Sequence, residues 1–168
     1  FNKKLSVCPV TTHLPIKAVS KKITKKEIIE KVELINSFYK YYLKKKPKIA
    51  VLGLNPHCES IDSFNEDEKI IKQTIKILKT KKYSITGPHS ADTIFLKQNR
   101  KKFNVIIGMY HDQVLSPIKA LKEYDAINIT LGLPFLRVSP DHGPNEKMIG
   151  KNLSNSSSLV KSIKFLDF

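Results

Sequence analysis

Three short apolar runs in this chain each lead into a histidine. The runs and the histidines that follow them are Leu5 to Thr12 with His13, Ile49 to Leu54 with His57, and Val105 to Met109 with His111. Short runs rich in β-branched residues are typical of buried strands in a parallel sheet. In open α/β sheets, ligands bind beyond the carboxyl ends of the strands. We therefore expect the polar residues after these strands to form the functional site.

Helical spacing of apolar residues separates the predicted strands. Thr24 to Glu27 is a capping box, and the apolar pattern behind it predicts a long helix that ends near Lys46. Three further helices are predicted, one starting at about Glu66 and the others covering Ala91 to Leu96 and Leu159 to Leu166. Strands that alternate with helices indicate an α/β fold.

The remaining predictions are less regular. Two more strands are expected at Ile127 to Leu131 and Phe135 to Val138, and a short element around Tyr83 to Ile85. Pro15 is expected to force an extended exit from the first strand. Pro117 and Lys119 are assigned to a loop or a helix start.

Composition narrows the class of protein. The 168 residues, 40% of them hydrophobic, are enough for one domain with a sizeable core. No run of about 18 apolar residues is present, and the first residues lack the apolar segment of a signal peptide, so a cytoplasmic protein with no membrane contact is expected. Cys8 and Cys58 have no CxxC partner, so both are expected to be reduced.

A formal net charge of +15 raises a polyanion as a partner. The cations are scattered at predicted helix ends and loops, where helix dipoles favour them. Nearly all are lysines, since Arg100 and Arg137 are the only arginines, whereas base and phosphate recognition relies heavily on arginine. A lysine-rich solvated surface is therefore favoured over a nucleic-acid-binding face.

Several side chains have the chemistry of a metal and phosphate site. Three imidazoles with an open position would suit a catalytic divalent metal. The alternative is that each histidine only caps its own strand, and the residues alone leave both interpretations open. Lys119, Asn128 and Arg137 offer a cation, an amide and a guanidinium, which suit a phosphorylated, carboxylated small molecule. Asp112 and Asp141 are the carboxylates nearest to histidines in the sequence, so either is a candidate for orienting a ring or transferring a proton. Neither GxGxxG nor a P-loop is present.

Six motifs in order resemble the 4-hydroxythreonine-4-phosphate dehydrogenase family of vitamin B6 biosynthesis. They are Thr11-Thr12-His13-Leu14-Pro15, Gly53-Leu54-Asn55-Pro56-His57, Gly87-Pro88 with Ala91-Asp92-Thr93, Met109-Tyr110-His111-Asp112-Gln113, Asn128 to Pro134, and Arg137 with Asp141-His142-Gly143. The resemblance covers nearly the whole of residues 1–168. It implies a sheet with flanking helices like that of the isocitrate and isopropylmalate dehydrogenases, which bind NAD without the Rossmann fingerprint.

The resemblance also implies roles for individual residues. In the family, the positions of His13, His57 and His111 bind a divalent metal (Zn, Mg or Co) that is shared between the subunits of a homodimer. The positions of Lys119, Asn128 and Arg137 bind the phosphorylated hydroxy amino acid. Catalytic roles are implied for Asp112 and Lys119, and contacts with NAD for His142 and Gly143. The implied reaction is oxidation of 4-phosphooxy-L-threonine at its secondary alcohol, followed by decarboxylation.

Three departures from the family pattern bear on activity: the length of the chain, the residues after His57, and the residues after Gly143, where Pro144-Asn145-Glu146-Lys147 replaces the small-residue run that approaches the dinucleotide in the family. Family members are longer, so this chain is interpreted as a single compact carboxy-terminal portion that is expected to be inactive alone. The family's small residues after His57 are replaced by Cys58-Glu59-Ser60. Alternative functions are a related dehydrogenase of phosphorylated sugar acids, a basic nucleic-acid-binding module, and a structural remnant that has lost turnover.

Overall fold

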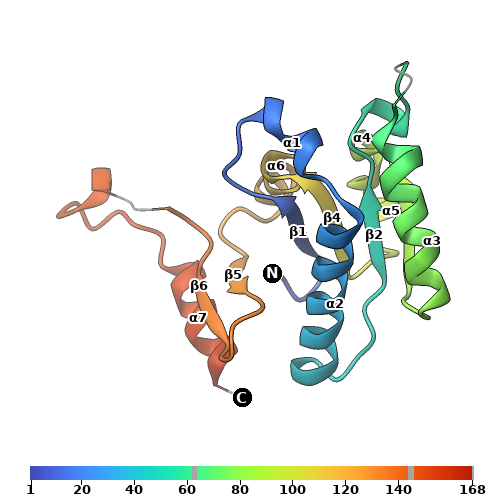
Figure 1. Ribbon diagram of the computed structural model, residues 1–168. Helices are drawn as coiled ribbons and strands as arrows, with labels where there is room; N and C mark the ends of the chain where they lie inside the picture. Colours follow the sequence, from blue (N-terminus) through green and yellow to red (C-terminus); the bar gives the residue numbers. More distant parts are fainter. Residues whose placement is uncertain (62–63, 144–145, 168) are drawn as a thin grey trace.

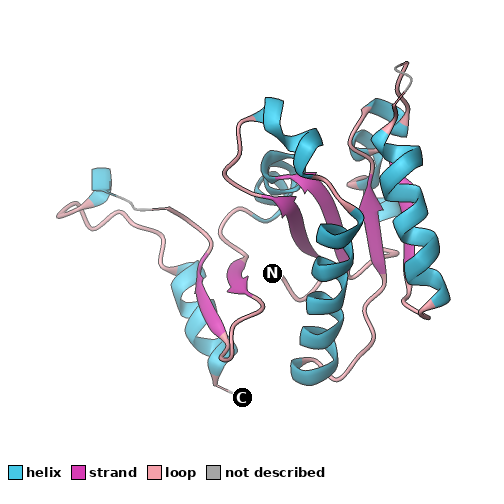
Figure 2. Ribbon diagram, viewed as in Figure 1, coloured by secondary structure: helices cyan, strands magenta, loops and turns pink. Residues whose placement is uncertain are grey.

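The computed structural model describes residues 1–61, 64–143 and 146–167. Helices flank a mainly parallel sheet, which confirms the predicted α/β class (Figure 1, Figure 2). The strands are β1 (Ser6–Thr11), β2 (Ile49–Leu52), β3 (Ile85–His89), β4 (Val105–Tyr110), β5 (Ile127–Thr130) and β6 (Arg137–Pro140). The helices are α1 (Ile16–Lys22), α2 (Lys25–Tyr42), α3 (Lys72–Thr80), α4 (Ala91–Ile94), α5 (Lys97–Arg100), α6 (His111–Lys122) and α7 (Ser157–Leu166), with short turns η1 (Pro56–Cys58), η2 (Asp67–Ile71) and η3 (Glu146–Met148).

Strand β4 is at the centre of the four-stranded sheet, whose order is β1-β4-β2-β3. It pairs in parallel with β1 on one side and β2 on the other, and all of its residues up to Met109 are buried. Its side chains alternate between two cores: Val105 and Ile107 face the helices α2 and α3, whereas Ile106 packs with α4 and α6. A strand that is buried on both faces has a continuous apolar sequence, and this pattern is the basis on which β4 was predicted.

Helix α2 is the longest element, and it packs on the first of these cores. Thr24 caps it by accepting a hydrogen bond from the Glu27 backbone N–H at 3.2 Å, as the capping box predicts. At the other end, the Tyr39 hydroxyl lies 3.2 Å from Ser6 Oγ of β1. The helix ends at Tyr42 rather than near Lys46.

Strands β5 and β6 form a separate antiparallel pair, with Thr130 opposite Arg137. Together with α7 they lie to one side of the main sheet (Figure 1). Phe165 of α7 joins them to the core, because its ring stacks on Phe38 of α2 and also contacts Phe1. The strand that the sequence predicts at Phe135 to Val138 is β6, and it runs from Arg137 to Pro140 instead.

The prediction for Pro117 and Lys119 is wrong. Pro117 and Lys119 lie well inside α6, which begins directly at His111. Val114 and Ile118 of this helix are buried against the sheet, and their packing outweighs the backbone hydrogen bond that Pro117 forgoes. Pro15 is extended as predicted, but α1 begins immediately after it, since a proline before the first helical residue loses no helical hydrogen bond.

Candidate active site

His13 and His111 lie side by side at the carboxyl edge of the sheet. Their strands are neighbours, with Thr11 opposite Tyr110, and their ring centroids are 5.7 Å apart. His111 is the first residue of α6, whereas His13 has a left-handed backbone with φ of 52°. The structure thus places two of the three predicted histidines together at one edge of the sheet.

His57 also follows a strand at this edge, but its side chain is directed elsewhere. Its Nδ1 lies 4.0 Å from Asp92 Oδ2, and its backbone is left-handed with φ of 54°. Across the part of the chain that the structure describes, no three His, Cys, Asp or Glu side chains are placed to hold one metal ion. One copy of the chain therefore brings together two of the three predicted imidazoles.

Asp112 is placed to control the His111 ring. Its Oδ1 is 2.6 Å from His111 Nδ1. A carboxylate at this nitrogen favours the tautomer with the proton on Nδ1, which leaves the lone pair of Nε2 available to a metal. The adjacent rings and this carboxylate fit part of a divalent-metal site.

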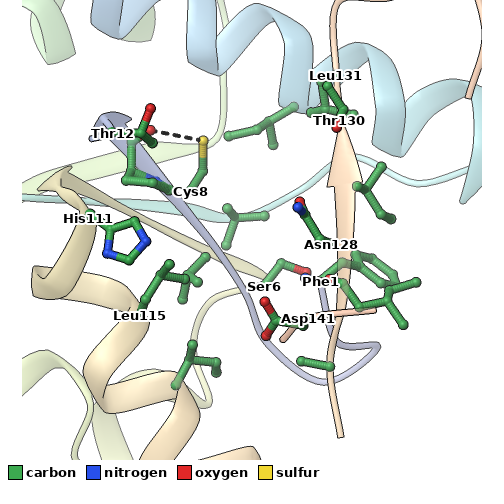
Figure 3. A pocket seen from close by; sticks show the side chains of 18 of the residues that line it. Phe1, Ser6, Cys8, Thr12, His111, Leu115, Asn128, Thr130, Leu131 and Asp141 are labelled. Atoms are coloured by element: carbon green, nitrogen blue, oxygen red, sulfur yellow. Dashed lines mark hydrogen bonds between the residues drawn. The ribbon is translucent and has the colours of Figure 1, made fainter. Parts of the chain in front are cut away.

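A cleft of about 1090 Å³ opens beside the histidine pair, between β1, α2 and α6 on one side and β5 with the end of β6 on the other. Its lining includes eight of the residues singled out in the sequence, His13, His111, Asp112, Lys119, Asn128, Asp141, His142 and Gly143. Figure 3 shows His111 and Leu115 on one side of the pocket and Asn128, Thr130 and Leu131 on the other. The cleft thus brings two of the three candidate metal ligands, His13 and His111, into one space with Lys119 and Asn128, two of the three candidate substrate ligands.

Arg137 is at the margin of this cleft. Its Nη1 donates to Thr130 Oγ1 at 2.8 Å, and Thr130 lines the cleft. Because directly paired residues of an antiparallel ladder project to the same face, Arg137 shares a face with Thr130 and, two residues along, with Asn128. The guanidinium therefore borders the predicted substrate site without lining it.

Lys119 contacts an acidic partner across the cleft. Its Nζ lies 3.2 Å from Asp141 Oδ2 and also donates to the Asp141 backbone carbonyl. Asp141 follows β6, so this ion pair connects α6 to the β5–β6 pair. Nearby, His142 Nδ1 is 3.0 Å from the Gly143 carbonyl oxygen, and both residues are exposed.

Two residues that hold this edge of the sheet, Gln113 and Asp67, were not predicted to have a supporting role. Gln113 is buried and connects β4 to β2, because its Oε1 accepts from the Met109 N–H at 2.6 Å and its Nε2 donates to the Gly53 carbonyl at 2.8 Å. Asp67 is fully buried against the loop before His57. The sequence showed Asp67 only as one of the acidic residues that helix dipoles favour in a first turn.

Neither thiol is activated for chemistry. Burial raises the pKa of Cys8, in the cleft wall, to about 11. Burial also raises the pKa of Cys58. A thiol is a nucleophile only as its thiolate, so the chemistry of this cleft falls to its imidazoles, carboxylates and cations.

The sequence matches a known family over almost its whole length. The family model described as pyridoxal phosphate biosynthetic protein PdxA covers residues 1–166. The chain belongs to the PdxA family. It is 46% identical over 164 residues to the 4-hydroxythreonine-4-phosphate dehydrogenase of Sulfurihydrogenibium sp. (strain YO3AOP1), covering 96% of this chain and 50% of the relative. The corresponding enzyme of Ruegeria sp. (strain TM1040) is 40% identical, with 95% of this chain and 50% of the relative covered.

Solved structures agree with this family membership. A putative 4-hydroxythreonine-4-phosphate dehydrogenase from Salmonella typhimurium matches with a TM-score of 0.82 and 33% identity, covering 98% of this chain and 50% of that one. A terephthalate 1,2-cis-dihydrodiol dehydrogenase from Burkholderia xenovorans LB400 has a TM-score of 0.76 at 21% identity, over 97% of this chain and 52% of that one, and this likeness shows the fold alone. The chain spans about half the length of the relatives that it matches.

No helix within residues 1–61, 64–143 and 146–167 is long and apolar enough to cross a membrane.

Proposed function

We propose that this chain supplies metal- and substrate-binding residues to a cytoplasmic 4-hydroxythreonine-4-phosphate dehydrogenase of pyridoxal phosphate biosynthesis. The observation that carries the proposal is the pairing of His13 with His111 in the cleft that Lys119 and Asn128 also line. The reaction is NAD-dependent oxidation of the secondary alcohol of 4-phosphooxy-L-threonine, followed by decarboxylation. His142 and Gly143 contact the nicotinamide cofactor in this proposal.

In this proposal, each residue of the cleft has its own role in binding. Lys119 and Arg137 provide charge-assisted donors for the phosphate and carboxylate groups, while the Asn128 amide fixes the orientation of the substrate between them. Asp112 keeps His111 in the tautomer that presents Nε2. A divalent metal bound by the imidazoles would act as a Lewis acid toward the oxygen of the reacting alcohol and ketone.

The third imidazole is proposed to come from a second copy of the chain. In one copy the His57 ring lies beside Asp92, and among the described residues it forms no metal-holding group with the other two imidazoles. We therefore place His57 of the partner subunit beside His13 and His111, which makes the homodimer a condition for a complete site.

Mixed dimers test this arrangement. His57→Ala and His111→Ala chains each lack one ligand in every site of their own homodimers. Random mixing of the two should restore about a quarter of the Zn²⁺ sites, since half of the dimers are mixed and each holds one intact site. Equilibrium dialysis that finds no regained high-affinity Zn²⁺ would contradict the shared site.

Calorimetry tests the substrate. Binding of 4-phosphooxy-L-threonine should require both the phosphate and a divalent metal, so unphosphorylated 4-hydroxythreonine serves as the matched control ligand. A phosphorylated sugar acid tests the related activity. Equal heats for 4-hydroxythreonine and its phosphate ester would refute the proposed substrate class.

A further inference from the structure

The side chain of Asp67 is buried against the loop that leaves β2. It is 0% exposed, and its two oxygens accept hydrogen bonds from the Leu54 N–H at 2.8 Å, the Asn55 N–H at 3.1 Å and Asn55 Nδ2 at 2.9 Å. A buried carboxylate is costly unless such donors surround it. The contacts fix the two residues that lead into Pro56 and His57.

The loop itself has an uncommon backbone. His57 and Cys58 are consecutive residues with left-handed φ angles of 54° and 63°. Non-glycine residues adopt this conformation only where the surroundings impose it, and such strain concentrates at functional sites. The loop therefore depends on outside contacts for its shape.

Gly53 provides the space for the Asp67 contact. A Cβ at this position would lie 2.6 Å from Asp67 Oδ1 and 2.7 Å from Cys58 Sγ. Only glycine lets the carboxylate and the thiol approach the end of β2 so closely. Gly53 is also the residue whose carbonyl Gln113 binds, so two separate contacts hold this strand end.

Asp67 is itself held by a rigid support. It begins the π-helical turn η2, and its backbone N–H donates to Asn65 Oδ1 at 2.9 Å. Ile71 at the end of the turn is 0% exposed, and the adjoining α3 is anchored in the core by Ile75 and Leu78. Single π-helical turns occur frequently at functional sites. The carboxylate is thus at a fixed distance from the sheet.

We propose that Asp67 is a positioning residue for His57, holding the Leu54–His57 loop so that the His57 imidazole is presented for metal binding. Asp67 lies behind the loop and acts only through it. This inference rests on the proposed function insofar as it takes His57 as a metal ligand.

The test substitution is Asp67→Asn. The amide has one accepting oxygen, and its NH₂ group would face N–H donors, so the three hydrogen bonds cannot all be kept. The matched control is Glu68→Gln, which removes the same charge one residue away from an exposed side chain that pairs with Lys72.

The first measurement is the rate at which a thiol reagent modifies Cys58. In Asp67→Asn this rate should rise about tenfold, because the loop opens more often. Cys8 is an internal control, since it lies on β1, away from the Asp67 contacts, and its raised pKa of about 11 keeps its thiolate fraction low. Glu68→Gln should match the parent chain. A Cys58 rate in Asp67→Asn equal to that of the parent would overturn the proposal.

The second measurement is Zn²⁺ affinity in a double-mutant cycle. Asp67→Asn should weaken Zn²⁺ binding about 10- to 100-fold, as loss of an outer contact to a ligand does. In a His57→Ala background the same substitution should cost nothing further, because Asp67 acts through that ring. An additive loss would refute the positioning role.

The two proposals fail differently. If the parent chain binds no Zn²⁺, the metal assignment is wrong. The rate of Cys58 modification, together with the histidine ring signals in NMR, still decides whether Asp67 holds the loop. If Asp67→Asn does not fold, Asn55→Ala replaces it. This substitution removes one of the three hydrogen bonds to Asp67, together with the contact of Asn55 Nδ2 to Glu66 Oε2, and should give smaller changes in the same direction.

Discussion

Lys119 and Asp141 form an ion pair across the cleft, with Nζ 3.2 Å from Oδ2. A phosphate group that binds Lys119 must compete with this carboxylate. We expect Asp141→Asn to tighten binding of the phosphorylated substrate about two- to fivefold, the worth of a partly exposed ion pair. Asp125→Asn is the control, because it removes an equal charge that pairs with Lys161 on α7. Calorimetry that shows weaker binding for Asp141→Asn would mean that Asp141 itself holds the substrate.

Arg137→Ala should weaken substrate binding about tenfold or more, as expected for a hydrogen bond to a charged group. Its hydrogen bond to Thr130 allows the charge of the guanidinium to be tested separately from its position. Thr130→Val removes the hydroxyl that holds the guanidinium but leaves the charge, so a smaller loss is expected there. Binding constants measured for both variants should follow this order. Unchanged affinity in Arg137→Ala would refute a substrate role for this residue.

The chain should form a dimer at micromolar concentration and yet produce no NADH from substrate by itself. Tyr41 and Tyr42 of α2 are 65% and 48% exposed, and a two-fold contact would bury them. Because the proposed metal site spans both copies, a chelator should raise the monomer fraction. Sedimentation and an NADH assay decide the two halves of this prediction. A monomer in the presence of Zn²⁺ would contradict the predicted dimer. Metal-dependent NADH formation would contradict the predicted lack of turnover.

His89 should make stability fall in mild acid. Burial lowers the pKa of this imidazole, and Lys102 lowers it further. The unfolded chain, with the ordinary value of about 6.5, then binds the proton first, so the free energy of unfolding decreases as pH falls from about 6.5 toward the lower folded pKa. His89→Gln should flatten this decrease in chemical denaturation. The same slope in both proteins would contradict the assignment.

Strands β1, β2 and β4 of the main sheet were predictable because their residues have one dominant preference, whereas β3 (Ile85–His89) shares only Ile85 with the element expected at Tyr83 to Ile85. Val105 to Met109 is apolar throughout, and any fold that buries it on both faces satisfies the pattern. Helix α6 was missed at Pro117, where the local rule against proline is outweighed by burial of Val114 and Ile118. Packing of this kind is decided by the sheet, and a local window of sequence does not contain it.

The candidate site was predictable to a similar extent. Placing His13 and His111 at one edge required only that their strands be parallel neighbours. The direction of His57 depends on a left-handed backbone and on Asp67, a residue ten positions further along the chain. Hydrogen bonds of that kind have no sequence signature, so the supporting residues could be found only in three dimensions.

Strands β1 and β5 each pair on one side only within the described residues. Such edges are templates on which another extended chain can add, and they make a protein prone to aggregation. The net charge of +15 opposes this, because copies of the chain repel one another. Added salt weakens that repulsion over distances beyond about 8–10 Å. The lysines outside the cleft therefore keep copies of the chain apart by charge repulsion. We expect the chain to precipitate more readily as ionic strength rises.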